Sequence, residues 1–275
     1  MQEPFTNAPY VHPYRAPSYF AQQLRAINFA KATNKRLLWI IAHDVPSSLV
    51  SAGAKQEERE ERWLEFHDRY TSGIPGVFPL VLGLPVRFTD TPYGPCREQG
   101  VCKNARGWLR GWKLSEEEER RLEESSEPEV VLTQRPLRLF IEVVSATSKL
   151  PLIEGKRIFI LNIHRKQWSI DGAGKVPVTR YGFPLVPDFG GTAHAYCGTT
   201  LLACIGDLLP WHARPRQEDA QKGYIIKSRT RDAANMLLAQ PYCPMLFRQG
   251  VQEGPQLLLQ VLRGDITTKD AKVAW

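Results

Sequence analysis

The run from Gly190 to Thr200 is the part of the sequence best suited to contact an anion. It is Gly-Gly-Thr-Ala-His-Ala-Tyr-Cys-Gly-Thr-Thr, so hydroxyl and imidazole groups stand among three glycines. Single-stranded nucleic acid needs donors to its phosphate oxygens, which threonine hydroxyls and glycine amides supply. An alternative is a helix start that Thr192 caps, with His194 in a structural role. The candidate residues are Thr192, His194, Gly198 and Thr199.

A second candidate lies thirty residues after His194, where Tyr-Ile-Ile-Lys-Ser-Arg-Thr-Arg extends from Tyr224 to Arg231. Arginine suits phosphate recognition because its planar guanidinium is always charged and binds two oxygens at once. Arg229, next to Ser228, is the candidate. The alternative is that Arg229 and Arg231 are ordinary surface cations on a helix.

Both segments resemble motifs of one enzyme family. Residues 183–201 resemble motif V of the Pif/RecD-type superfamily-one DNA helicases, which has Phe-Pro-Leu, a short apolar stretch and Thr-Ile-His-Lys-Ser-Gln-Gly-x-Thr-Leu. Residues 224–231 are similar to motif VI, Tyr-Val-Ala-x-Ser-Arg-x-Arg, and the two motifs stand in the family's order. The positions in register with motif V are Thr192, His194, Gly198, Thr200 and Leu201.

A third segment extends the resemblance over nearly the whole chain. Leu84–Thr89, followed by Lys103–Leu109, is similar to the point at which the family's chain leaves the second motor domain. There an Asn-Gly-x-x-Gly-like turn opens a small barrel. Three ordered segments are more specific than any one of them alone. We therefore expect the C-terminal half of such a helicase.

The resemblance implies ATP-driven unwinding of DNA, in repair or recombination. Such a motor hydrolyses ATP between two α/β domains, one of which cradles the phosphates and magnesium while the other supplies an arginine finger. The resemblance assigns the finger to Arg229 and nucleotide contact to Arg229 and Ser228. It assigns contacts with single-stranded DNA to Thr192, His194, Gly198 and Thr199.

The sequence contains no phosphate-binding loop. Such a loop needs Gly-x-x-x-x-Gly-Lys-Ser/Thr. The nearest match, Gly172–Lys175, has Ser169 at the first glycine position and Val176 at the last position. We therefore expect no ATP hydrolysis by this chain alone. ATP and magnesium are expected only together with an N-terminal RecA-like half, in cis or in trans.

Two positions depart from motif V. Ala195 stands where the family has lysine, and Cys197 stands where it has glutamine. These changes remove a cation that reaches phosphate and an amide that helps couple nucleotide state to DNA contact. Two other classes of function stay open: a nucleic-acid-binding module without motor activity, and a degenerate interaction domain that no longer binds DNA.

The apolar pattern predicts an α/β protein. Residues 1–85 and 180–275 are expected to form a RecA-like second motor domain, with a parallel sheet and a C-terminal packing helix. Residues 86–179 alternate β-type segments with turns and are expected to form an inserted, barrel-like β domain. Eight glutamates between residues 115 and 129 predict a solvated surface excursion. Further expected elements are two short strands within 100–113, helices at 188–197 and 217–228, and strands at 200–208 and 236–239.

The overall composition is that of a globular protein with a mild preference for acidic partners. The 275 residues are 43% apolar and carry a net charge of +7. Residues 151–275 hold 16 Lys+Arg against 10 Asp+Glu, whereas residues 1–150 hold 20 against 19. Five cysteines without paired spacing, no signal peptide and no long apolar run predict an intracellular protein. We expect it in the nucleus or mitochondrion rather than the cytoplasm, not secreted and with no membrane partner.

Overall fold

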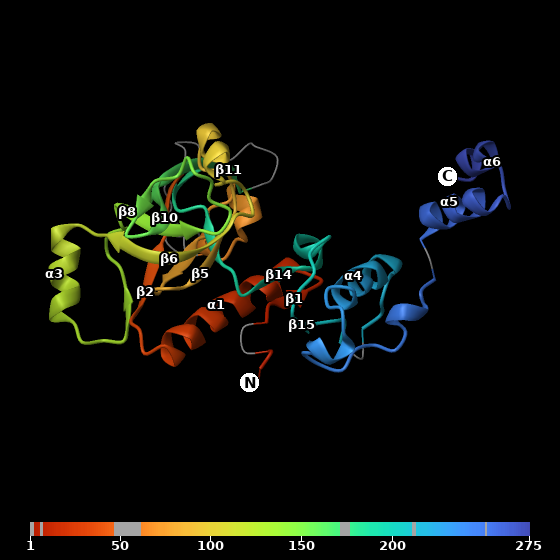
Figure 1. Cartoon of the computed structure of the whole chain (residues 1–275), viewed down its shortest axis with the longest axis horizontal. Helices are drawn as coiled ribbons and strands as arrows, with labels where there is room; N and C mark the ends of the chain where they lie inside the picture. The colour runs from red at the N-terminus through yellow and green to blue at the C-terminus, as the bar shows by residue number, and fades with distance from the viewer. Residues whose placement is uncertain (1–2, 6–7, 47–61, 171–176, 211–212, 251) are drawn as a thin grey trace. The chain divides into compact units, whose positions relative to one another are not determined.

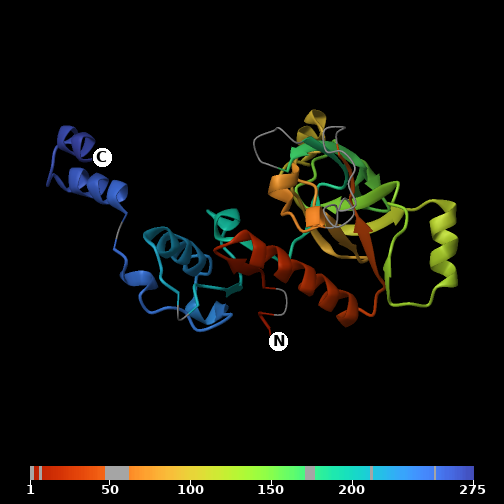
Figure 2. The same ribbon diagram turned by 180° about the vertical axis from the view of Figure 1, so that it is seen from behind.

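The computed structural model describes residues 3–5, 8–46, 62–170, 177–210, 213–250 and 252–275. The chain divides into two compact units (Figures 1 and 2). Unit 1 contains residues 1–18 and 190–275, and unit 2 contains residues 19–189. The boundary between Phe189 and Gly190 falls inside the segment that resembles motif V, so the two parts of that segment belong to different units.

Unit 1 contains a four-stranded parallel sheet in the order β14-β1-β15-β16. The start of the chain therefore lies between two strands from its C-terminal part (Figure 1). A small apolar core that includes Val11, Tyr196 and Ile226 packs against the sheet. The elements are β1 (Tyr10–His12), β14 (Gly190–Thr192), η4 (Ala193–Tyr196), β15 (Cys204–Gly206), α4 (Gln217–Lys227), η5 (Ala233–Asn235), β16 (Met236–Leu238), η6 (Leu246–Arg248), α5 (Glu253–Arg263) and α6 (Thr268–Ala274).

The helix predicted at 188–197 is wrong: this segment forms β14 and a single 3-10 turn. Successive glycines disfavour a helix, and Gly190 approaches β1 closely. A Cβ atom at Gly190 would lie 2.1 Å from the carbonyl oxygen of Tyr10. Pairing with a distant strand therefore decides the conformation. The helix at 217–228 and the strand at 236–239 are confirmed, and the strand at 200–208 shortens to β15. The C-terminal helix forms as α5, but none of its residues is buried, so it does not pack into a core as expected.

Unit 2 combines three sheets, most of whose strand pairs are antiparallel. Their orders are β13-β5-β6-β8-β10-β9, β11-β12-β3 and β4-β2-β7. α1 (Arg15–Ala32) begins within unit 1 and continues into unit 2. The other elements are β2 (Leu37–Ile41), β3 (His43–Pro46), η2 (Asp68–Thr71), β4 (Val77–Leu80), β5 (Pro85–Phe88), η3 (Gly94–Gln99), β6 (Arg106–Lys113), α3 (Glu116–Glu124), β7 (Glu129–Val131), β8 (Arg138–Val143), β9 (Leu152–Ile153), β10 (Lys156–Asn162), β11 (His164–Ser169), β12 (Pro177–Gly182) and β13 (Leu185–Pro187).

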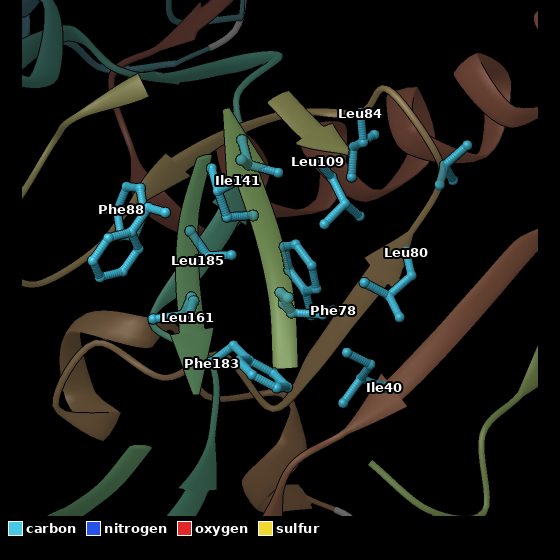
Figure 3. Close-up of a cluster of buried hydrophobic side chains, with 14 of the residues drawn as sticks. Ile40, Phe78, Leu80, Leu84, Phe88, Leu109, Ile141, Leu161, Phe183 and Leu185 are labelled. Atoms are coloured by element: carbon cyan, nitrogen blue, oxygen red, sulfur yellow. The ribbon is translucent and has the colours of Figure 1, made fainter. Parts of the chain in front are cut away.

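One large apolar core occupies unit 2. In β8, Leu139, Ile141 and Val143 are buried while the residues between them are half-buried, the period-2 pattern of a strand with one face on the core. Figure 3 shows Ile141 with side chains from the neighbouring strands and from the β4-β2-β7 sheet. The Phe-Pro-Leu part of the motif V resemblance contributes Phe183 and Leu185 to this core, at 2% and 0% exposure. These two residues are therefore structural.

The residues around Trp108 form one strand where two were expected. β6 runs unbroken from Arg106 to Lys113, with a bulge between Leu109 and Gly111. A bulge lets a strand bend without ending. Gly107 is required here because a Cβ atom would lie 2.3 Å from the carbonyl oxygen of Glu142 on β8.

The acidic segment is mostly exposed, as expected, and one of its glutamates is an exception. Glu118 on α3 is 1% exposed. Its carboxylate accepts hydrogen bonds from the amide of Thr133 at 3.0 Å and from Arg121 at 2.5 Å. These bonds hold the pKa of Glu118 below its usual value, although burial opposes them. Glu118 therefore anchors the helix that carries most of the other glutamates.

The two units differ from the predicted domains in the placement of residues 19–85. These residues were expected to share a domain with 180–275, but they lie in unit 2. The cause is strand pairing: β2 pairs with β7, and β5 pairs with β6, so both join strands of the expected insert. The division into a motor domain and an inserted barrel stays a prediction.

Positive charge is spread over both units. Unit 1 holds 11 Lys+Arg against 8 Asp+Glu, and unit 2 holds 25 against 21, so the net charges are +3 and +4. The excess of positive charge after residue 150 therefore does not correspond to one of the two units. Among the described residues, the helices are too short or too polar to cross a bilayer.

Candidate nucleic-acid interface

The turn that follows β14 (residues 192–201) contains every candidate DNA-binding residue. Ala193 and Tyr196 are buried in the unit 1 core, whereas His194, Cys197 and Gly198 are exposed. The amide of Cys197 donates to the carbonyl of His194 at 3.3 Å, and the amide of Thr199 donates to that of Tyr196 at 3.0 Å. The turn is thus fixed at two core positions and presents its remaining groups to solvent.

The conformation of the turn suits contact with an extended ligand. Gly198 has a φ of +75°, and a Cβ atom there would have no neighbour within 4 Å. Thr192 precedes η4, but its side chain makes no capping hydrogen bond. The alternative in which Thr192 caps a helix is therefore wrong. Thr192 and Thr199 are half-buried at the two ends of the turn.

The side chain of Arg229 joins the two motif-like segments. Its Nη1 donates to the carbonyl oxygens of Tyr196 at 2.6 Å and Thr199 at 3.2 Å. Its Nε donates to the carbonyl of Ile225 at 2.7 Å, and its Nη2 donates to the hydroxyl of Ser228 at 2.7 Å. Arg229 is half-buried, and Arg231 is exposed. The interpretation of Arg229 as an ordinary surface cation does not fit these contacts.

A polar network that the sequence did not indicate lies at the carboxyl edge of the parallel sheet. Asp207, directly after β15, accepts hydrogen bonds from the hydroxyl of Tyr10 and from Nε2 of Gln240, the latter at 2.8 Å. His12 ends β1, and its Nε2 lies 3.9 Å from Asp207. The carboxyl ends of parallel strands are where ligands bind in open α/β sheets.

The ring of His12 is held beside this network by the backbone of Tyr14. Nδ1 of His12 lies 2.9 Å from the amide nitrogen of Tyr14 and 3.1 Å from its carbonyl oxygen, and these contacts fit either ring tautomer. Burial lowers the pKa of His12, and the charge of Asp207 only partly opposes this. Burial also raises the pKa of Tyr10. In the sequence, the sign of this network was a polar residue at the end of each short apolar segment, His12 after Val11 and Asp207 after Gly206. Only the parallel pairing of β1 with β15 brings these residues together.

Asp188 in the motif V-like segment has a structural environment. Its carboxylate lies 3.3 Å from Nε of Arg87 and 3.0 Å from Nε of Arg106. Burial raises the pKa of Asp188, and the two arginines oppose that rise. The three side chains connect β5 and β6 with the residue that follows β13, within unit 2.

The remaining candidate for phosphate binding, Gly172–Lys175, lies outside the described residues. Within the described residues, no three His, Cys, Asp or Glu side chains are grouped closely enough to hold a metal ion. The groups of this region that fit a nucleotide are the Arg229 guanidinium and the Ser228 hydroxyl, since both suit phosphate oxygens.

Comparison with known proteins shows similarity in structure without similarity in sequence. No protein-family model matches the chain, and no curated protein matches it. Pif1 helicase from Candida albicans superposes with a TM-score of 0.55 at 11% identity, over 95% of this chain and 51% of that one. A structure described as two coordinating Pif1 helicases unwinding forked dsDNA gives a TM-score of 0.52 at 9% identity, over 94% of this chain and 44% of that one. The chain therefore has the fold of about half of a Pif1 helicase.

Proposed function

We propose that this chain is the C-terminal motor half of an ATP-dependent DNA helicase. The observation that carries the proposal is the fold match over 95% of the chain, within which the two motif-like segments touch through Arg229. Both segments resemble motifs of one family, and the side chain of Arg229 brings them into contact. The setting that goes with this proposal is DNA repair or recombination in the nucleus or mitochondrion.

In this proposal the turn at residues 192–201 contacts single-stranded DNA. The exposed imidazole of His194 stacks on a base or donates to a phosphate, and the open space at Gly198 lets the DNA backbone approach the amides. Thr192 and Thr199 supply hydroxyl donors at the two ends. Such contacts read no sequence, so binding is expected to be general for single strands.

Nucleotide binding in this proposal needs an N-terminal RecA-like half, in cis or in trans. That half holds ATP and magnesium, and this chain adds Arg229 as a finger that stabilises charge on the transferred phosphoryl group. Ser228 lies beside it. To reach a phosphate, the guanidinium of Arg229 exchanges its bonds to the carbonyls of Tyr196 and Thr199 for bonds to phosphate oxygens.

These same bonds favour one alternative, a nucleic-acid-binding module without motor activity. Four hydrogen bonds from Arg229 already go to groups of its own unit. In that case Arg229 maintains the shape of the turn and never meets a nucleotide. ATPase activity on adding an N-terminal half distinguishes the motor from the module.

Binding to single-stranded DNA tests the interface itself. We expect a dissociation constant near the micromolar range that weakens steeply as salt increases. His194→Ala is expected to weaken binding about fivefold or more, the scale of losing one stacked base. Fluorescence anisotropy of a labelled oligonucleotide measures both effects, with Leu202→Ala as a control because Leu202 is 93% exposed near the turn. Absence of salt dependence, or equal affinities of the two variants, would favour a degenerate interaction domain.

A further inference from the structure

The second half of the turn, residues 196–201, is held at three points by one residue, Arg229. Its guanidinium donates to the carbonyl oxygens of Tyr196 and Thr199, at 2.6 and 3.2 Å. Its own main-chain carbonyl accepts from the amide of Leu201 at 2.7 Å. Leu201 and Thr230 also form an isolated parallel bridge. Side chain and backbone of Arg229 therefore fix the start, the middle and the end of the turn.

The turn has few other means of keeping its shape. Residues 197–200 belong to no helix or strand, and Cys197 and Gly198 are exposed. The hydrogen bond from the amide of Thr199 to the carbonyl of Tyr196 is the internal bond that closes the turn. That same carbonyl is the one that Arg229 binds most closely. An arginine fork holds two carbonyls at a fixed separation, which a flexible lysine does not.

We infer that Arg229 is a positioning residue for the DNA-contacting turn. It sets the positions of the backbone amides at 197–199, separately from any role as a finger. The inference rests on the proposed function only in assigning DNA to the turn. One consequence is that a phosphate oxygen bound to the Arg229 guanidinium competes with the carbonyls that shape the turn, so nucleotide contact and DNA contact share one side chain.

The surroundings of the guanidinium agree with this role. Ser228 and Ile225 contribute a hydroxyl and a carbonyl, both neutral acceptors. On β15, burial raises the pKa of the Cys204 thiol to about 11, and the charge of Arg229 opposes that rise. Within the described residues, no carboxylate lies at ion-pair distance from Arg229. Neutral acceptors can be exchanged for an anion more readily than a carboxylate partner.

Hydrogen exchange of the intact chain, resolved to single amides, tests the positioning role. Arg229→Ala is expected to accelerate exchange of the Thr199 and Cys197 amides by about tenfold or more, the scale of losing hydrogen bonds to a charged donor. The Leu201 amide should change less, because its partner is the main-chain carbonyl of residue 229, which the substitution keeps. Arg231→Ala removes the same charge from the same segment and is expected to change these rates less than about twofold.

A second variant and DNA affinity separate positioning from general stability and from the proposed function. Arg229→Lys keeps the positive charge. Weaker DNA binding by this variant, together with fast exchange of the Thr199 amide and an unchanged melting temperature, supports the positioning role. Arg229→Lys also takes the place of Arg229→Ala if Arg229→Ala unfolds. Unchanged exchange of the Thr199 amide in a folded Arg229 variant overturns the inference, whether or not DNA binds. If the unsubstituted chain binds no DNA while the Arg229 variants show fast Thr199 exchange, the positioning role is kept and the proposed function is rejected.

Discussion

Two arginines, one in each unit, show how differently the same side chain is used. Arg180 on β12 is fully buried, and it donates to both carboxylate oxygens of Asp44, at 2.8 and 2.6 Å, and to the carbonyls of Ile74 and Trp63. Arg229 in unit 1 is half-buried and binds carbonyls and a hydroxyl. The charge of Arg180 is compensated by a carboxylate, whereas the charge of Arg229 is not.

The difference teaches which arginine is available for an anion. A buried guanidinium with a carboxylate partner is locked, because separating the pair leaves an unpaired buried charge. The Trp168 ring, 5.2 Å from the Arg180 guanidinium, further encloses that pair. A half-exposed guanidinium among neutral acceptors loses only ordinary hydrogen bonds when a phosphate replaces them. The groups that an arginine side chain contacts, a carboxylate or neutral acceptors, therefore distinguish a structural arginine from a candidate functional one.

The largest expected effect concerns Arg229 in a reconstituted two-half motor. Arg229→Ala should lower the ATP hydrolysis rate about a thousandfold or more, as loss of an arginine finger does. ATP binding should weaken much less, because the finger acts mainly in the transition state. Steady-state ATPase assays check this with Arg231→Ala as the control. Equal rates for the two variants would contradict a finger role and leave Arg229 as a structural clamp like Arg180.

Breaking the buried pair should be the next largest change. Arg180→Met removes the partner of the Asp44 carboxyl, which is 4% exposed, and is expected to lower the unfolding free energy of unit 2 by about 3–5 kcal/mol. Asp44→Leu combined with Arg180→Met should recover most of that loss. Urea unfolding followed by tryptophan fluorescence measures it, since Trp63 and Trp168 lie beside the pair. Arg110→Met is the matched control, because its pair with Glu142 is 34% and 23% exposed and is worth less than about 1 kcal/mol.

A smaller effect compares two glycines of the motif V-like segment. Gly190→Ala should lower the stability of unit 1 by about 1–3 kcal/mol, because the added methyl group would overlap the Tyr10 carbonyl in β1. Gly198→Ala meets open space, so its cost is limited to about 1–2 kcal/mol of strain at a φ of +75°. Gly190→Ala should therefore accelerate hydrogen exchange of the unit 1 strand amides, whereas Gly198→Ala should accelerate exchange of the amides in the turn. If Gly198→Ala accelerated exchange of the strand amides and Gly190→Ala did not, the assignment of Gly190 to the sheet and Gly198 to the turn would be contradicted.

The smallest expected effect is a pH dependence from His12. Burial lowers its pKa in the folded chain below the ordinary value of about 6.5. The unfolded chain therefore binds the proton more readily, and unit 1 loses stability as pH falls from about 6.5 towards the lowered pKa. His12→Asn should remove this slope, whereas His194→Asn on the exposed turn should keep it. Strand-amide exchange at pH 7.5 and 5.5 measures the difference, and equal slopes in both variants would exclude His12 as the source.

Local sequence determined many of the elements but few of their partners. α4, β16 and α5 form where the residue pattern predicted them. The helix expected at 188–197 failed because Gly190 and Gly191 pair with β1, which comes from the other end of the chain. The strand pair expected around Trp108 failed because β6 continues through its bulge against β8.

The sequence by itself also determined the candidate turn and Arg229, through residue types that suit phosphate and their spacing. Only the tertiary structure decided that Arg229 binds Tyr196 and Thr199, that Asp207 meets Tyr10 and His12, and that residues 19–85 join unit 2. The physical reason is common to all three. Strand pairing and buried hydrogen bonds are satisfied by groups far away in sequence, and the residue pattern specifies that a partner is needed without specifying which one.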